Sequence, residues 1–176
     1  DGVTHLEAAR RGSLGLRLLP GRAEAGIDDG AAEVTVRGLG FVPQAADGAC
    51  AFAVDGETVR VALSRERRFV LRADAGNSAP AADPGPDRFV PVGTQVALDA
   101  GASCDLEGEA LDARWELLAA PPQSDWILHG ADTFTPWFTA SAPGTYRLRL
   151  VVTDARGATS RPAELRVRAV APGEDG

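Results

Sequence analysis

The chain has 176 residues, and its 24% charged and 44% hydrophobic content is typical of a folded globular protein and excludes a disordered one. Its formal net charge of −7 makes attraction to nucleic acid phosphates or to an anionic membrane unfavourable, so neither partner is expected. No apolar run approaches the roughly 18 residues of a membrane-spanning helix, and with no methionine and no signal peptide the sequence is expected to be part of a longer, exported protein.

The first elements are short strands separated by glycine and proline, with one exception at the start. Residues 4–11 are the best candidate for a helix, because Thr4 is suited to an N-cap and Glu7 follows it by three positions, and the alternative is a frayed leader. Strands are predicted at 32–37 and 68–73, and a hairpin is predicted between them. This density of short apolar stretches is typical of an all-β protein.

The hairpin is formed by residues 49–54 and 57–63, which alternate apolar and polar positions around Asp55 and Gly56. These two residues are suited to a two-residue type I′ turn. The turn would pair Phe52 with Val59 and Cys50 with Val61. Cys50 is therefore predicted to face the core of its own module.

Residues 75–86 contain mainly proline, glycine, alanine and aspartate and have no apolar pattern, which indicates a boundary between modules. We therefore divide the chain into a first module at 1–75, a linker at 76–86, a second module at 87–170 and a tail at 171–176. Strands of the second module are predicted at 94–100, 111–117, 145–153 and 163–170. Their alternation indicates two packed sheets, with Trp115 and Tyr146 facing inward.

The second module resembles a PKD-type immunoglobulin-like repeat over residues 77–169. The likeness is carried by Asn-Ser-Ala-Pro at 77–80, by the segments at 92–100, 103–109 and 135–139, by Arg-Trp-Glu-Leu at 114–117, and by Gly-Thr-Tyr at 144–146 with Leu-Val-Val-Thr-Asp-Ala-Arg-Gly at 150–157. It departs from the family after Trp115, where many repeats have Asp-Phe-Gly-Asp-Gly, and at Cys104, where a serine is usual. Residues 33–41 and 52–56 resemble an IPT/TIG-type module, the alternative being an unassigned β-sandwich.

These resemblances imply two tandem immunoglobulin-like β-sandwich modules in an extracellular, cell-surface or periplasmic protein. The expected function is that of a rigid, non-catalytic spacer in adhesion or protein–protein recognition. An alternative is an accessory carbohydrate-binding segment of a secreted hydrolase, and a third is a subunit of an extracellular assembly, which an apolar patch on the first module would favour. No enzymatic activity is expected, since the histidines, His5 and His129, lie near no catalytic or metal-ligand motif.

A calcium site is the one cofactor the sequence suggests. Asp105, Glu107 and Glu109 alternate across a loop that contains Gly108, which allows hard oxygen ligands to converge. Some PKD-type modules are known to bind calcium near this loop and the linker, and by this resemblance Asn77, Asp99 and Asp154 could complete the shell. The alternative is a solvated acidic loop in which Asp154 caps a turn.

Three further sets of residues are candidates for a functional role, and each set also has a purely structural interpretation. A disulfide between Cys50 and Cys104 would join the modules of an exported protein, unless Cys50 is a buried small hydrophobe. Trp126 and Trp137 are candidate anchors for a glycan or a protein, or they cover the ends of the sandwich. An outward basic stripe would meet an acidic partner or is a solvated face, and it comprises Arg147, Arg149, Arg166 and Arg168.

Overall fold

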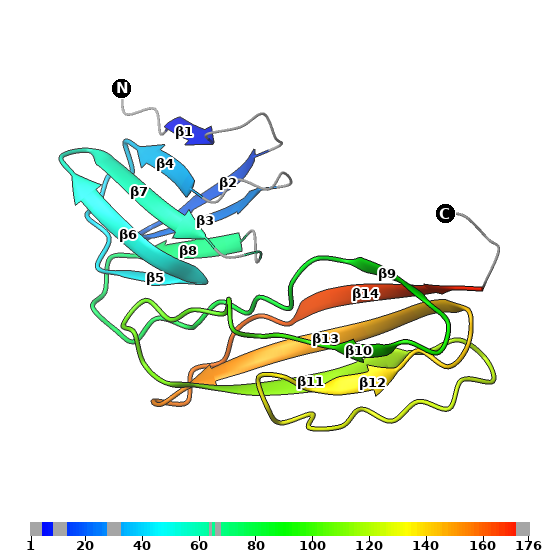
Figure 1. The fold of residues 1–176 in the computed structure, drawn as a ribbon. Coiled ribbons are helices and arrows are strands. Elements are labelled where there is room, and N and C mark those ends of the chain that lie inside the picture. Colours follow the sequence, from blue (N-terminus) through cyan, green and yellow to red (C-terminus); the bar gives the residue numbers. More distant parts are fainter. Residues whose placement is uncertain (1–4, 9–13, 28–32, 64, 66–67, 172–176) are drawn as a thin grey trace.

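The computed structural model describes residues 5–8, 14–27, 33–63, 65 and 68–171, and every regular element in these ranges is a β-strand. The predicted fold class, all-β with two tandem immunoglobulin-like sandwiches, is confirmed (Figure 1). The first module contains β1 His5–Ala8, β2 Leu14–Leu19, β3 Arg22–Ile27, β4 Glu33–Arg37, β5 Ala45–Asp47, β6 Ala49–Asp55, β7 Thr58–Leu63 and β8 Arg68–Arg72. The second contains β9 Arg88–Pro91, β10 Gln95–Ala97, β11 Leu111–Ala119, β12 Trp137–Thr139, β13 Gly144–Asp154 and β14 Ala163–Val170.

The first module packs two four-stranded sheets against each other, in the orders β1-β4-β7-β6 and β2-β3-β8-β5. Alternate residues of β4 and β7 are buried, as expected for strands with one face toward a core. The core that they share with the opposite sheet includes Val34, Val36, Val59, Val61, Ala23, Ala25, Phe69 and Leu71. This side-chain layer holds the two sheets together.

The second module packs the sheet β11-β13-β14-β9 against the short pair β10-β12. Trp115, Phe138 and Tyr146 are buried in its core, and the rings of Phe138 and Tyr146 lie 5.1 Å apart. The hydroxyl of Tyr146 accepts a hydrogen bond from the Ala142 N–H at 3.0 Å and donates one to the Ala142 carbonyl at 3.1 Å. This pairing satisfies a buried polar group and fixes the turn before β13.

The helix predicted at residues 4–11 is wrong in the described part of that segment. Residues 5–8 form β1, which pairs antiparallel with β4, while residues 4 and 9–11 lie outside the described ranges. A helix of eight residues pays a nucleation cost that few hydrogen bonds offset. The open edge of β4 supplies backbone partners instead, and the segment extends the sheet.

The hairpin forms where it was predicted, but its register is shifted by two residues. Asp55 pairs with Thr58 around a turn at Gly56 and Glu57, so that Phe52 lies opposite Val61 and not Val59. Gly56 has φ of +60°, a left-handed conformation that glycine adopts at low cost. Because the shift is an even number of residues, the valines of β7 still face the core.

Cys50 does not face its own core as predicted, because a β-bulge interrupts the ladder at this position. Ala49 pairs with Leu63 and Ala51 with Ala62, which leaves Cys50 as the additional residue. A bulge locally re-aims the side chain that it carries. Cys50 is only half-buried and is turned toward the second module, where it is covalently bonded.

Candidate functional site

The segment predicted as a linker is packed between the two modules. Ser78, Ala81 and Ala82 are fully buried, and Asp83 is nearly so. Ala82 belongs to the core of the second module, whereas Leu106, from a loop of the second module, packs against the core of the first. The modules therefore share buried apolar surface, and we refer to residues 77–83 with the groups that contact them as the junction.

A disulfide bond between Cys50 and Cys104 crosses the junction. Cys50 comes from the bulge in β6, and Cys104 comes from the acidic loop of the second module. The backbone of Cys104 also pairs with Ala81 through two hydrogen bonds, of 2.8 and 3.0 Å. The covalent bond thus ties the first module to a loop that is itself hydrogen-bonded to the linker.

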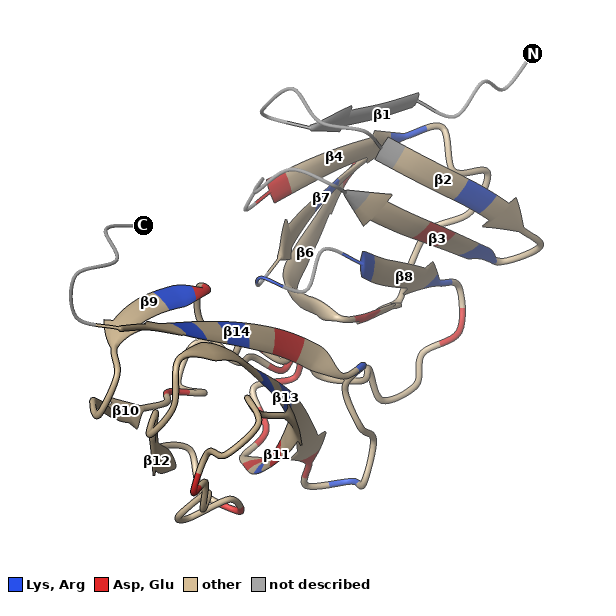
Figure 2. Cartoon of the chain, turned by 90° about the vertical axis from the view of Figure 1, so that its right-hand side faces the viewer, with Lys and Arg blue, Asp and Glu red and all other residues tan. Residues whose placement is uncertain are grey.

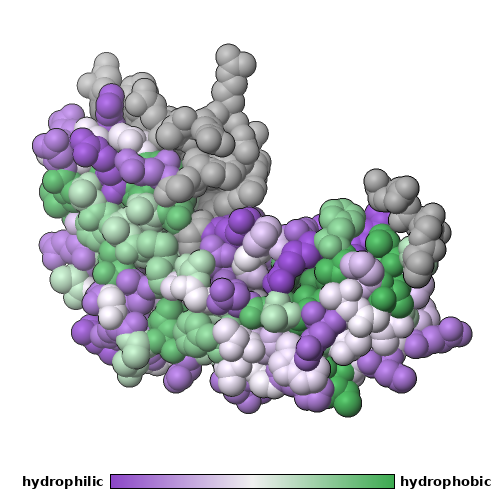
Figure 3. Space-filling model, in the orientation of Figure 1, coloured by the Kyte–Doolittle hydropathy of each residue, from purple (hydrophilic) through white to green (hydrophobic). Residues whose placement is uncertain are grey.

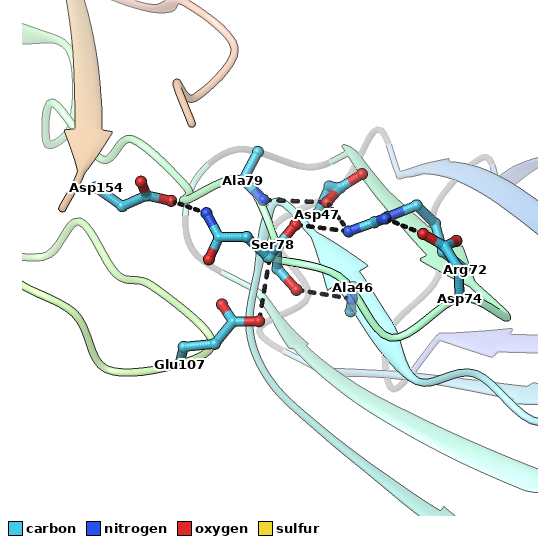
Figure 4. A network of polar contacts seen from close by, with 9 residues as sticks. Ala46, Asp47, Arg72, Asp74, Ser78, Ala79, Glu107 and Asp154 are labelled. Atoms are coloured by element: carbon cyan, nitrogen blue, oxygen red, sulfur yellow. Dashed lines mark hydrogen bonds and ion pairs between the residues drawn. The ribbon is translucent and has the colours of Figure 1, made fainter. Parts of the chain in front are cut away.

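Polar groups of the first module hold the linker from one side (Figure 4). The Asp47 carboxylate accepts a hydrogen bond from the Ala79 N–H at 3.0 Å and forms an ion pair with Arg72 at 3.2 Å. The Ser78 hydroxyl accepts from the Ala46 N–H at 3.2 Å, and the Ala79 carbonyl accepts from the Gly48 N–H at 2.8 Å. Both backbone groups of Ala79 are therefore bonded to the first module.

Polar groups of the second module hold the same segment from the other side. Glu107 accepts a hydrogen bond from the Ser78 N–H at 3.1 Å, and the Asn77 side chain donates to Asp154 at 2.7 Å (Figure 4). The carbonyl of Asn77 in turn accepts from Arg72 of the first module at 2.7 Å. Consecutive residues of the linker thus contact both modules, which restricts their relative rotation.

Asp154 is buried at the end of β13, and its environment keeps it ionised. Burial raises the pKa of this carboxyl, but hydrogen bonds from Asn77 and from the backbone N–H groups of Ala158, Arg156 and Gly157 outweigh it, so the pKa lies below its usual 3.8. The distances to the N–H groups of Arg156 and Ala158 are 2.9 and 2.8 Å. Asp154 therefore caps a turn and anchors the linker through Asn77.

The six residues predicted as calcium ligands do not form one cluster of carboxylates. Among the described residues, no group of three or more His, Cys, Asp or Glu side chains could hold a metal ion. Asp99 accepts a hydrogen bond from the Gly101 N–H at 2.7 Å, and Glu109 forms an ion pair with Arg156 at 2.6 Å. Glu107 and Asp154 are used in the junction as described above.

Three buried oxygen atoms near the junction nevertheless have no hydrogen-bond partner within the described ranges. They are Oδ1 of Asn77, Oδ1 of Asp105 and Oε2 of Glu109. The segments that carry these atoms are connected by hydrogen bonds and an ion pair. The second carboxylate oxygen of Asp105 accepts a hydrogen bond from the Glu109 N–H at 3.0 Å. Glu109 in turn pairs with Arg156, which lies in the turn that Asp154 caps. Two carboxylates and an amide are hard oxygen donors, which fit a calcium ion in chemistry.

The two tryptophans outside the core differ in how accessible their rings are. Trp126 lies in the long loop between β11 and β12 and is 47% exposed, next to the exposed Ile127. Trp137 on β12 stacks on His129 with ring centroids 3.9 Å apart, and the backbones of these two residues form a bridge. His129 thus covers one face of Trp137, whereas Trp126 is the more accessible ring.

The predicted arginine stripe lies on the outer face of β13 and β14 (Figure 2). Arg147 pairs with Glu164 at 2.9 Å, and Arg149 pairs with Glu116. Arg166 and Arg168 are exposed, and no side-chain partner is found for them in the described part of the chain. Half of the stripe is therefore neutralised by neighbouring glutamates.

No family model matches the chain, and no curated protein matches it either. Among solved structures, the chain is similar to the PKD domain from the KIAA 1837 protein, with 25% identity and a TM-score of 0.47 over 58% of this chain and 97% of that one. It is also similar to a nucleoside hydrolase-related hypothetical protein from Saccharophagus degradans associated with carbohydrate metabolism, with 14% identity and a TM-score of 0.48 over 56% of this chain.

A third similar structure is Drosophila N-cadherin EC1-3, with 11% identity and a TM-score of 0.42 over 96% of this chain. The chain spans 28% of the Saccharophagus protein and 55% of the cadherin. Within the described residues, no helix is long and apolar enough to cross a membrane.

Proposed function

We propose that this chain is a non-catalytic, rigid two-module spacer of an exported or cell-surface protein, acting in adhesion or protein–protein recognition. The observation that carries the proposal is the junction. A flexible linker is exposed and few contacts cross it. Here the linker is buried, both modules bond to the same residues, and a disulfide adds a covalent connection. Such a junction fixes the distance and angle between whatever the two modules carry.

The disulfide also favours an oxidising location. Disulfides persist in secreted, surface and periplasmic proteins and are reduced in most cytosols. Without the Cys50–Cys104 bond, the modules would be held only by the linker chain and its non-covalent contacts. An exported spacer is the class of protein in which this connection would be maintained.

Rigidity is testable by ¹⁵N relaxation on the whole chain. If the modules form one body, the amides of β7 and of β13 report one rotational diffusion tensor. The matched control is the Cys50→Ser/Cys104→Ser variant, in which only the disulfide is removed. Two independent correlation times for the modules of the oxidised wild type would refute the proposal.

Calcium is proposed as a stiffening ligand of the same junction. The support is the set of unpartnered oxygens of Asn77, Asp105 and Glu109. An ion held by them would connect the start of the linker to the acidic loop and would satisfy buried acceptors that otherwise carry a desolvation cost.

Carbohydrate binding is the second candidate function, and the exposure of Trp126 favours it. An accessible indole offers a flat apolar face of the kind on which sugar rings stack. Titration with soluble glucans and xylans, followed by tryptophan fluorescence, tests it. Quenching in the wild type that Trp126→Ala abolishes would support this function, while an unchanged spectrum at millimolar glycan would exclude it for those sugars.

A further inference from the structure

The first module has an open sheet edge at β6, far in sequence from the arginine and tryptophan sites. In the order β1-β4-β7-β6, strand β6 has a partner on one side, and its other side has no strand partner among the described residues. Exposed edges invite pairing with another chain, and proteins usually protect them with charges, proline or short length. Four other edge strands, β2, β5, β9 and β11, follow that rule.

These four edges carry charges or proline, or are short. Strand β11 presents Asp112, Arg114 and Glu116, and β9 contains Arg88 and ends at Pro91. Strand β2 includes Arg17, and β5 has three residues. By contrast, β6 has neither a charge nor a proline from Ala49 to Val54. Apart from the bulge at Cys50, this edge therefore has none of the features that prevent pairing with another chain.

The register of the hairpin shows which backbone groups the edge offers. Asp55 and Thr58 close a two-residue turn and form a hydrogen-bonded pair, and such pairs alternate with non-hydrogen-bonded ones along an antiparallel ladder. Phe52 and Val54, opposite Val61 and Val59, are in the non-hydrogen-bonded positions. Their N–H and C=O groups consequently point away from β7, toward the open side.

An apolar groove adjoins the same stretch. It has a volume of about 270 Å³ and lies between the 38–43 loop and the end of the β6–β7 hairpin. Val42 from the loop is 65% exposed and Val54 from β6 is 40% exposed, and both line it. Hydrophobic side chains gather over this part of the first module in Figure 3. The groove is the size of one or two side chains and is below the usual range for small-molecule pockets.

We infer that β6 is a docking site for an extended, uncharged segment of a partner protein, which adds as a strand to the sheet and inserts an apolar side chain between Val42 and Val54. In this binding mode, main-chain hydrogen bonds supply affinity and a side-chain pocket supplies specificity. Here the outward backbone groups of β6 and the apolar groove lie within a few residues of each other. The groove lies at the hairpin end of β6, whereas Cys50 near the other end of the strand belongs to the junction. The inference goes beyond the spacer function, and its failure would leave the contacts of the junction unchanged.

The test uses the whole oxidised chain and a defined peptide, acetyl-Lys-Lys-Thr-Val-Thr-Val-Thr-Val-Lys-Lys-amide. We expect binding with a Kd below 1 mM, with changed chemical shifts and slowed hydrogen exchange at the amides of Phe52 and Val54. Val54→Pro removes the outward N–H and leaves the β6–β7 ladder intact. Its matched control, Val54→Ala, trims the same side chain but keeps the N–H.

Val54→Pro should weaken binding at least tenfold relative to Val54→Ala, and Val42→Lys should weaken it by closing the groove. The same peptide with N-methylated valines should not bind to the wild type, a result that also decides the matter if the proline variant fails to fold. Equal binding of the N-methylated peptide, or no shifts at residues 52 and 54 at millimolar peptide, would overturn the inference. Light scattering that shows a dimer of the free chain, abolished by Val54→Pro, would identify a second copy as the occupant and would also overturn it.

Discussion

Removal of the disulfide should destabilise the protein by an amount that follows from its position. The bond closes a loop of 54 residues. In the chain-entropy description, a cross-link of this span lowers the entropy of the unfolded chain by about 14 cal/mol/K, which corresponds to about 4 kcal/mol at 25 °C. For a chain of this size, that loss lowers the melting temperature by roughly 8–16 °C.

The assay compares three samples by circular dichroism during thermal and urea unfolding. They are the oxidised wild type, the wild type kept reduced, and the Cys50→Ser/Cys104→Ser variant. The reduced wild type and the double variant should have the same melting temperature and urea midpoint, both well below those of the oxidised wild type. Serine retains the size of the cysteine side chain but cannot form the bond. If the double variant melted with the oxidised wild type, the bond would not constrain the unfolded chain, and the argument for a covalently fixed junction would fail.

Three other changes test separate parts of the structure. Tyr146→Phe leaves the buried Ala142 N–H without its acceptor and should cost about 1–3 kcal/mol, measured by urea unfolding. The pKa of Asp154 is lower in the folded than in the unfolded state. Its stabilising effect is therefore present above about pH 4 and is lost as the pH falls through the folded-state pKa. In urea unfolding, Asp154→Asn should be less stable than the wild type at pH 7, but it should lose less stability than the wild type between pH 5 and pH 2. Calcium at 5 mM should raise the melting temperature and EDTA should reverse the change, since bound ligand favours the folded state; an unchanged melting temperature, or an equal rise in Asn77→Ala, would remove the proposed site.

The strands of the second module could be predicted from the sequence because each one repeats its apolar residues at every second position. The ranges expected around Trp115, Tyr146 and Leu165 match β11, β13 and β14 within one or two residues. Strands with weak alternation were not predicted. Strand β3, for example, has alanine and glycine where large apolar side chains would be expected, and its pairing with β8 brings it into the sandwich.

The candidate site was predicted only in its parts. Asn77, Glu107 and Asp154 were selected as oxygen ligands, and the structure brings them to the junction as hydrogen-bonding partners of the linker and of one another. The contributions of Asp47 and Arg72 were missed, although Asp47 lies just before the predicted strand at 49–54 and Arg72 lies within the predicted strand at 68–73. No local pattern indicates that such charges face another module.

The sequence by itself determined that the chain is built from half-buried strands in two modules, because alternation is a local property that each segment displays without its partners. Tertiary structure decided the bulge at Cys50, its bond to Cys104, the burial of residue 78 and residues 80–83, and the packing of Leu106 on the first core. Each of these depends on groups that are distant along the chain and meet only after the sheets have formed. A proline- and alanine-rich segment has the same composition whether it is exposed or enclosed, and here the surfaces on either side of it enclose it.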